Sequence, residues 1–418
     1  MTIEKLHTLF LQHPIVDTDT RKIRENSIFF ALKGENFNGN LFATKALNHG
    51  AKYAIIDEDL ETDSKNIIKV DNVLETLQNL ATFHRNYLGI PIIGLTGSNG
   101  KTTTKELINA VLSQKYNCSA TVGNLNNHIG VPLTLLCMNK ETEIGIVEMG
   151  ANHLKEIELL SNIAQPNYGL ITNFGKAHLE GFGGIEGVIK GKSELYKYIK
   201  NSNGEVFINQ NDPIQLKQSK GLNTRTIDAS INLIDTTPFV KVSFDDIEIQ
   251  SNLIGKYNYT NIALAITIGN YFKVPKNKIK VALETYVPTN NRSQIIETES
   301  NKIILDAYNA NPSSMKVALE NFDTIKAAAK IVILGDMFEL GETSNEEHQS
   351  ITELAENLNF ETVILIGENF SHVKARKASK FESFSDFINN VDFTNFKHSS
   401  ILIKGSRGMA LERVLDFL

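Results

Sequence analysis

The chain has 418 residues, of which 41% are hydrophobic and 22% are charged, so it can bury the cores of two or three domains and is not broadly disordered. Its net charge of −6, without a clustered Lys/Arg run, excludes the electrostatic attraction on which nucleic-acid-binding proteins depend. The two cysteines, Cys118 and Cys137, are too few for a disulfide framework and lack zinc-ligand spacing. We expect a cytoplasmic protein with neither a targeting signal nor membrane insertion, because no apolar run reaches membrane-spanning length.

Residues 1–88 are expected to form a small α/β domain. Short apolar runs at 27–32 and 53–57 alternate with an amphipathic segment at 40–48. Polar residues at 19–21 and 33–35 lie at the edges of the predicted strands, where side chains and free N–H groups could hold a phosphate or a uracil. Solvated loops are the simpler explanation of these residues taken alone.

A strand, a glycine loop and a helix follow at residues 92–104, in the order typical of a nucleoside-triphosphate site. Gly97 and Gly100 let the backbone turn its N–H groups toward phosphate oxygens, and the helix that begins near Lys101 adds the positive end of its dipole. Lys101 can reach the β- and γ-phosphates, and Thr102 can reach Mg²⁺. The loop is compressed, because the first glycine of the usual pattern would fall at Leu95. A glycine turn without phosphate is the structural alternative.

A second, larger domain is predicted from residue 89 to residue 288. Apolar strands at 144–148, 168–172 and 205–208, separated by helical patterns, indicate a mainly parallel sheet, whose ligands belong at the carboxyl ends of the strands. Glu148 ends one strand, where a carboxylate can ligate Mg²⁺ beside the phosphate loop. His178 follows the next strand in a glycine-rich loop, and Lys192 lies shortly after on a predicted helix that runs on through Glu194 to Tyr196. Each of the three residues alone has an ordinary structural explanation; their shared location makes them candidates.

The rest of the second domain carries one further candidate. Alternating apolar residues at 239–244 and 247–250 predict a small antiparallel excursion. Asn258 is positioned to cap a helix that carries Asn261 one turn later. The exposed amide of Asn261 could both donate to and accept from an adenine edge.

A third α/β domain is predicted for residues 289–418, after a boundary at 287–290. Its apolar strands are expected at 303–306, 330–334, 362–366 and 401–404, and glycines follow several of them, which again indicates a doubly wound sheet. The first strand ends in a polar segment that runs from Asp306 through Tyr308, Asn309 and Asn311. Arg292 precedes that strand.

Taken together, these motifs resemble the Mur ligase family over essentially the whole chain. Residues 96–103 match the family's compressed phosphate loop, which sister ligases and folylpolyglutamate synthases share. Residues 123–132, 147–152, 177–182 and 306–311 are more discriminating, and they are similar to the family member that adds a dipeptide. The resemblance implies an α/β fold of three domains: a small N-terminal UDP-sugar domain, a central P-loop parallel-sheet ATPase domain and a C-terminal Rossmann-like domain.

The resemblance also implies the reaction. ATP would phosphorylate a carboxylate of a UDP-N-acetylmuramoyl-tripeptide, and the amine of D-alanyl-D-alanine would displace phosphate from the acyl phosphate in peptidoglycan precursor synthesis. The implied cofactors are ATP, Mg²⁺ and a carbamylated Lys192, and the enzyme is expected to act as a monomer. An ammonium cannot ligate a cation, whereas a carbamate offers two oxygens and a negative charge.

The same resemblance assigns roles to individual residues. Catalytic roles fall to Lys101, Lys192, His178 and Glu148, and metal ligation to Thr102, Glu148, His178 and Lys192. ATP contacts are expected from Gly97, Ser98, Asn99, Gly100, Lys101, Thr102, Thr103, Asn261, Arg292 and Asp306. Substrate contacts are expected from Thr20, Arg21, Ser27, Asn126, Asn127, Asn309 and Asn311.

Residues 17–21 and 27–35 are similar to the family's UDP-sugar domain, with one departure. An acidic residue and a histidine are common in the turn that here contains Asn38 and Asn40. Two alternatives remain at this stage. A sister ligase that adds the third amino acid would share the core, although the Asp-Asn-Pro-Arg motif of the diaminopimelate-adding enzymes does not occur here. A nucleotide-binding module without ligase activity would need only the phosphate loop.

Overall fold

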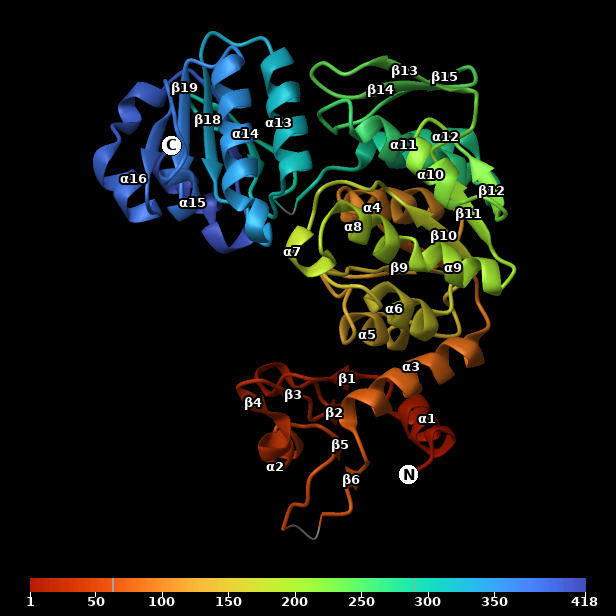
Figure 1. Ribbon diagram of the computed structural model, residues 1–418. Helices are drawn as coiled ribbons and strands as arrows, with labels where there is room; N and C mark the ends of the chain where they lie inside the picture. Colours follow the sequence, from red (N-terminus) through yellow and green to blue (C-terminus); the bar gives the residue numbers. More distant parts are fainter. Residues whose placement is uncertain (62–63, 290) are drawn as a thin grey trace.

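A computed structural model describes residues 1–61, 64–289 and 291–418, so Asn290 of the predicted boundary lies outside the described residues. Three α/β units follow one another along the molecule, and the central unit lies between the other two (Figure 1). This arrangement confirms the three-domain α/β architecture expected from the sequence. Within the described residues no helix is both long and apolar enough to cross a bilayer.

The first unit is built on a parallel sheet of order β1-β2-β5-β6. Its strands are β1 (Val16–Asp17), β2 (Ile28–Phe30), β5 (Tyr53–Ile56) and β6 (Ile67–Lys69), with a hairpin of β3 (Lys33–Gly34) and β4 (Phe37–Asn38). Its helices are α1 (Ile3–Gln12), α2 (Ala43–Asn48) and α3 (Val73–Leu88). Asn72 caps α3 and left-handed Gly89 ends it, and α3 packs on the central helices α5 and α6, so it joins the two units.

The central unit has an all-parallel six-stranded sheet of order β12-β11-β10-β7-β9-β8. The strands are β7 (Ile92–Thr96), β8 (Cys118–Ala120), β9 (Ile144–Glu148), β10 (Tyr168–Ile171), β11 (Glu205–Ile208) and β12 (Asn223–Thr226). The helices are α4 (Lys101–Leu112), α5 (Gly130–Leu136), α6 (Glu156–Ala164), α7 (Leu179–Phe182), α8 (Ile185–Lys192), α9 (Glu194–Asn201) and α10 (Pro213–Gln218). After β9 the chain crosses to the other side of β7, which places the topological switch point, where ligands bind, beside the phosphate loop.

An antiparallel meander of β13 (Ile231–Asp235), β14 (Lys241–Phe244) and β15 (Ile247–Gln250) confirms the predicted excursion. Two helices follow, α11 (Asn258–Tyr271) and α12 (Lys276–Thr285). The predicted cap is wrong, because Tyr257 occupies the N-cap position of α11. The Asn258 amide instead donates to the Ile254 carbonyl and accepts from Asn261, and both asparagine side chains are buried.

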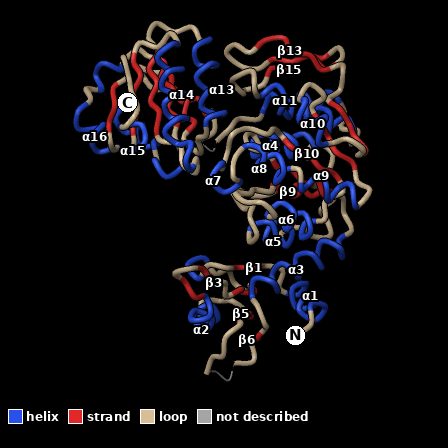
Figure 2. The backbone as a smooth tube through the Cα atoms, in the orientation of Figure 1, coloured by secondary structure: helices blue, strands red, loops and turns tan. Residues whose placement is uncertain are grey.

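The third unit has a sheet of order β16-β17-β21-β18-β19-β20, parallel except for the edge strand β16. Its strands are β16 (Gln294–Glu297), β17 (Lys302–Asp306), β18 (Lys330–Gly335), β19 (Thr362–Ile366), β20 (Ser379–Phe381) and β21 (Ser400–Lys404). Its helices are α13 (Pro312–Thr324), α14 (Ser344–Asn357), α15 (Glu368–Ser371) and α16 (Phe384–Asn390), and they lie on both sides of the strands (Figure 2). Both faces of this sheet are therefore covered, which explains why its strands read as continuous apolar runs.

Candidate functional site

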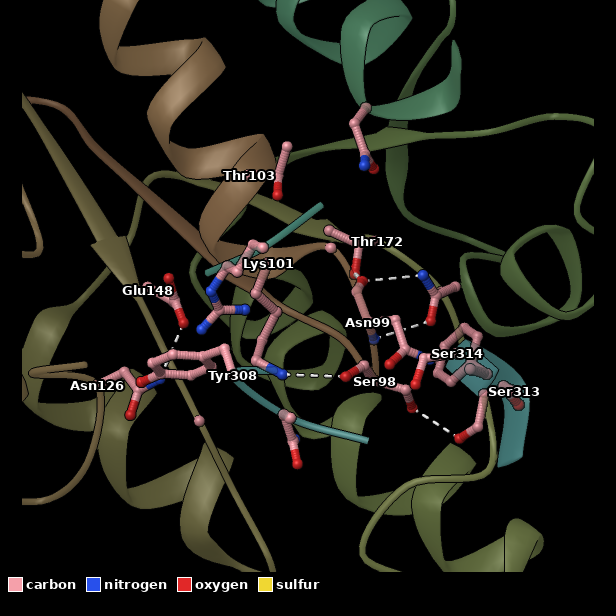
Figure 3. A pocket seen from close by; sticks show the side chains of 18 of the residues that line it. Ser98, Asn99, Lys101, Thr103, Asn126, Glu148, Thr172, Tyr308, Ser313 and Ser314 are labelled. Carbon is pink, nitrogen blue, oxygen red and sulfur yellow. Dashed lines mark hydrogen bonds between the residues drawn. The ribbon is translucent and has the colours of Figure 1, made fainter. Parts of the chain in front are cut away.

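A cavity of about 970 Å³ lies between the central and third units. The central unit contributes residues at or just after the ends of β7, β9 and β10, and the third unit contributes residues at or just after the end of β17 and the last residue of β21. Figure 3 shows Lys101 and Glu148 of the central unit with Tyr308, Ser313 and Ser314 of the third unit around it. Because the carboxyl ends of two parallel sheets meet there, the cavity is where both units would place a ligand.

The phosphate loop forms one wall of the cavity. Ser98, Asn99, Gly100, Lys101 and Thr103 line it, whereas Gly97 and Thr102 are buried. Gly97 has a φ of +146°, and a Cβ at this residue would lie 1.9 Å from the Thr172 hydroxyl oxygen. Gly100, with a φ of +78°, opens α4. Both glycines are thus required by the backbone, and α4 directs the positive end of its dipole at the loop.

Lys101 is held beside the loop rather than in solvent. Its Nζ donates to the carbonyl oxygens of Gly97 at 2.7 Å and Ser98 at 3.2 Å. Burial lowers the pKa of Lys101 to about 8; the nearby charge of Glu148 opposes this shift and that of Arg292 adds to it. An anion in the cavity would add to the negative charge of Glu148 and so favour the ammonium form of Lys101.

We expect nucleotide binding near pH 9 to take up close to one proton, because the phosphates would restore the pKa of Lys101 from about 8 toward its ordinary value of about 10.4. At pH 9 the Lys101 amine of the unliganded protein is mostly neutral, because this pH lies above its lowered pKa. The negative charge of bound phosphates would favour the protonated form. Titration calorimetry in two buffers of different ionisation enthalpy measures this uptake. The Lys101→Met variant should lose it, and equal uptake in both proteins would assign the proton to another group.

Glu148 presents a carboxylate oxygen that no neighbour uses. Its Oε1 accepts from Thr102 Oγ1 at 3.2 Å and from Asn126 Nδ2 at 2.8 Å. Its Oε2 is buried and has no hydrogen-bond partner among the described residues, although the residue lines the cavity and is only 1% exposed. A buried carboxylate oxygen without a partner is costly, and a bound cation would satisfy it.

His178 also lines the cavity, but its nearest partner comes from the third unit. The His178 Nδ1 atom pairs with the Glu339 carboxylate. The His178 backbone is left-handed, with a φ of +53°. In the described part of the chain, no group of three or more His, Cys, Asp or Glu side chains has the arrangement of a metal site. His178 is therefore not part of a preformed cluster of standard ligands.

Lys192 is fully buried at the end of α8, and the helix breaks at Ser193 rather than continuing through Glu194 as predicted. Its Nζ donates to the Ala151 carbonyl at 2.9 Å and lies 5.0 Å from the centre of the Phe182 ring. Burial, together with the positive charge of Lys101, lowers the pKa of Lys192 well below its usual value. An amine in this setting is neutral far more readily than a surface lysine.

The third unit brings three charged groups to the cavity. Asp306, at the end of β17, accepts from Lys404 Nζ at 2.6 Å and from the Ser293 N–H at 3.2 Å. Arg292 stacks on the Tyr308 ring with 3.8 Å between the guanidinium carbon and the ring centre, and its buried Nε has no hydrogen-bond partner in the part of the chain that the structure describes. Arg292, Asp306, Tyr308 and Lys404 all line the cavity. The structure thus brings the predicted Arg292 and Asp306 opposite the phosphate loop.

Four predicted asparagines lie at or near the cavity. Asn261 lines it beside Gly100, where a Cβ would come within 3.1 Å of the Asn261 amide. Asn126, Asn127 and Asn309 line it as well, although the Asn127 oxygen is already used by the N–H groups of Ile129 and Gly130. Asn126 bonds Glu148, so it is tied to the proposed cation-binding carboxylate.

The structure does not bring the remaining predicted residues to this cavity. Asn311 is buried as the N-cap of α13, and its amide donates to Asn99 Oδ1 at 2.7 Å across the two units. Thr20, Arg21 and Ser27 lie in the first unit. Arg21 is exposed and pairs with Asp19 at 2.7 Å, whereas the Ser27 hydroxyl is buried and no described residue hydrogen-bonds to it.

The sequence interpretation missed three residues at the interface: Lys404, Tyr308 as a stacking partner, and Glu339. Lys404 ends a predicted strand, and Tyr308 lies inside the polar segment that follows another. Glu339 lies shortly after β18 and the Gly335-Asp336 turn, and this position at the carboxyl end of a strand is the sequence feature that could have indicated it. Their partners are remote in sequence, and only the packing of the two units pairs them.

Three family models match the chain: the Mur ligase family catalytic domain over residues 14–85, the Mur ligase middle domain over 95–269 and the Mur ligase glutamate ligase domain over 291–407. A UDP-N-acetylmuramoyl-tripeptide–D-alanyl-D-alanine ligase of Bacillus subtilis is 34% identical, covering 96% of this chain and 92% of the relative. The ligase of that name from Escherichia coli is 31% identical, covering 96% and 93%.

Solved structures agree with these matches. The crystal structure of MurF from Acinetobacter baumannii has a TM-score of 0.86 at 29% identity and covers 96% of this chain and 92% of that one. The structure of MurF ligase from Thermotoga maritima in complex with ADP has a TM-score of 0.84 at 27% identity and covers 97% of both chains.

Proposed function

The chain belongs to the Mur ligase family, and from this premise we propose that it joins D-alanyl-D-alanine to UDP-N-acetylmuramoyl-tripeptide, with conversion of ATP to ADP and phosphate. The observation that carries this function is the near full-length similarity to ligases of that specificity. The cavity between the phosphate loop and the third unit supplies a site for the chemistry. This ligation is a step of peptidoglycan synthesis, and we place the enzyme in the cytoplasm as a monomer.

The reaction needs ATP because a carboxylate has no adequate leaving group for attack by an amine. Phosphorylation supplies one, and the chain's own groups stabilise the charge that develops in transfer. Lys101 and the N–H groups of the loop would hold the phosphates from the central unit, with Thr103 beside them and Asn261 toward the base. Arg292 and Asp306 would meet the nucleotide from the third unit. The walls of the cavity between the two units would shield the acyl phosphate from water.

The residues present fit Mg²⁺. The partnerless Oε2 of Glu148, beside the Thr102 hydroxyl, provides the hard oxygen ligands that this cation prefers. Bound there, the cation would neutralise phosphate charge. We propose His178 and Lys192 as further ligands, the latter as a carbamate. A carbamate nitrogen keeps one N–H, so it could retain the hydrogen bond to the Ala151 carbonyl. The two carbamate oxygens would provide the metal ligands that an unmodified lysine cannot offer.

We further propose that the first unit binds the UDP-sugar through Thr20, Arg21 and Ser27, and that Asn126, Asn127, Asn309 and Asn311 serve the peptide end. The domain boundaries follow at 1–88, 89–288 and 289–418. The end of α3 at Leu88 and the positions of the three family matches inside these limits support the division.

Phosphate release tests the function. We expect release from ATP only when UDP-N-acetylmuramoyl-tripeptide and D-alanyl-D-alanine are both present, with the pentapeptide product seen by mass spectrometry. A sister ligase would instead respond to a single amino acid and a UDP-dipeptide. A nucleotide-binding module would bind ATP without acceptor-dependent release. Either result would overturn the proposal.

A further inference from the structure

A contact between His178 of the central unit and Glu339 of the third unit joins the two units at the cavity. His178 stands immediately before α7, and Glu339 lies in the loop between β18 and the short helix Gly341–Thr343. The Glu339 carboxylate pairs with His178 Nδ1, and the Glu180 N–H donates to the Glu339 carbonyl at 3.2 Å. A Cβ at Gly341 would lie 3.2 Å from the Glu180 Cβ, so the two backbones approach closely.

Both residues of the pair adopt left-handed backbone conformations that side chains disfavour. The φ angles are +53° at His178 and +60° at Glu339. Such conformations persist only where the surrounding structure holds them, and they concentrate at functional positions. Here the backbone contacts between α7 and the loop of the third unit hold both residues face to face.

The chemistry of the contact determines which imidazole nitrogen carries the proton. A carboxylate accepts but does not donate, so Nδ1 must be the donor and Nε2 carries the lone pair in the neutral ring. Within the described residues no hydrogen bond engages His178 Nε2, and the residue lines the cavity.

We propose that Glu339 is a positioning residue supplied by the third unit: it holds His178 in its Nδ1–H form and so presents Nε2 to the cavity when the two units are docked. Histidines that ligate metals are oriented in this way by a carboxylate on the other ring nitrogen. The use of Nε2 as a ligand rests on the proposed function, whereas the tautomer and its dependence on Glu339 do not.

A purely structural role, in which the pair only fastens the units together, makes a different prediction. Lys176 and Glu347 form another ion pair across the same interface, and the Lys176 N–H donates to Ser313 at 2.9 Å. Glu347 lies on α14 and does not contact His178. The Glu347→Ala variant is therefore a matched control, because it removes a cross-unit ion pair and leaves the imidazole alone.

The test is ¹⁵N NMR of the histidine rings in the full chain near pH 8.5, above the ordinary pKa of about 6.5 for imidazole. The His178→Gln variant identifies the signals. We expect protonated Nδ1 and unprotonated Nε2 in the wild type and in Glu347→Ala. In Glu339→Ala the proton should move to Nε2, the form that free histidine prefers, and Glu339→Gln should restore Nδ1–H because its amide oxygen still accepts.

The value of kcat/KM should fall about 10- to 100-fold in Glu339→Ala, the usual cost of losing such a partner. Glu347→Ala should stay within about twofold of wild type, since the ion pair is open to solvent on the side of the half-exposed Lys176 and such pairs contribute little. A wild-type His178 protonated at Nε2 or at both nitrogens, or ring signals unchanged in Glu339→Ala, would overturn the inference. If the expected tautomers appear in a protein that does not ligate, the proposed function fails and the role of Glu339 stands.

Discussion

Replacing Lys101 with alanine is expected to lower the rate of ligation by about 10³-fold, the loss typical of removing one essential charge-stabilising group. The lysine lies on the phosphate loop with its Nζ on the carbonyls of Gly97 and Ser98, close to where transferred phosphoryl charge would develop. The loss should appear in kcat as well as in kcat/KM for ATP, because the transition state carries more of this interaction than the ground state.

The fold should survive this change. The lowered pKa of Lys101 shows that the folded protein disfavours its charged form, so alanine removes a group that burial penalises. Thermal unfolding followed by circular dichroism should give a melting temperature no lower than that of the wild type. Ligation at the wild-type rate would show that Lys101 does not serve the phosphates, and a large drop in melting temperature would make it a structural residue.

Replacing Lys192 with alanine is expected to lower activity by at least about 10²-fold, because it removes a proposed ligand of Mg²⁺. The neutral amine that reacts with carbon dioxide is favoured here by burial. A short carboxylate such as acetate should restore part of the activity by occupying the vacated space. In the wild type, ¹³C-labelled bicarbonate should give a carbamate signal that the variant lacks.

Lys190 provides the control for this experiment. It lies two residues earlier on α8 and is exposed, so Lys190→Ala should retain both full activity and the carbamate signal. Full activity in Lys192→Ala without added carboxylate would sink the proposed role. Loss of activity without rescue, together with no carbamate signal in the wild type, would leave an essential lysine that acts as an unmodified amine.

The expected elements were largely recovered because the strands of parallel sheets are buried on both faces and read as continuous apolar runs. The runs at 144–148 and 362–366 match β9 and β19 residue for residue. The ends of helices were harder to predict from the sequence, as the helices at Asn258 and Lys192 show. At Asn258 the favoured capping residue was drawn into a buried asparagine pair, and at Lys192 the helix broke one residue later.

The sequence by itself determined the α/β class, the phosphate loop and Glu148 at its strand end, because each depends on residues within a few positions of one another. Only the tertiary structure decided which groups face each other across the cavity. Lys404 meets Asp306, Asn311 meets Asn99, and Glu339 meets His178, pairs separated by 98, 212 and 161 positions. Local patterns encode the direction of a strand and the cap of a helix, but they carry no information on how two separately folded units dock. The burial of Lys192 was also decided by the tertiary structure. Lysine is rarely buried as a residue type, and it is the packing around the end of α8 that removes its amine from water.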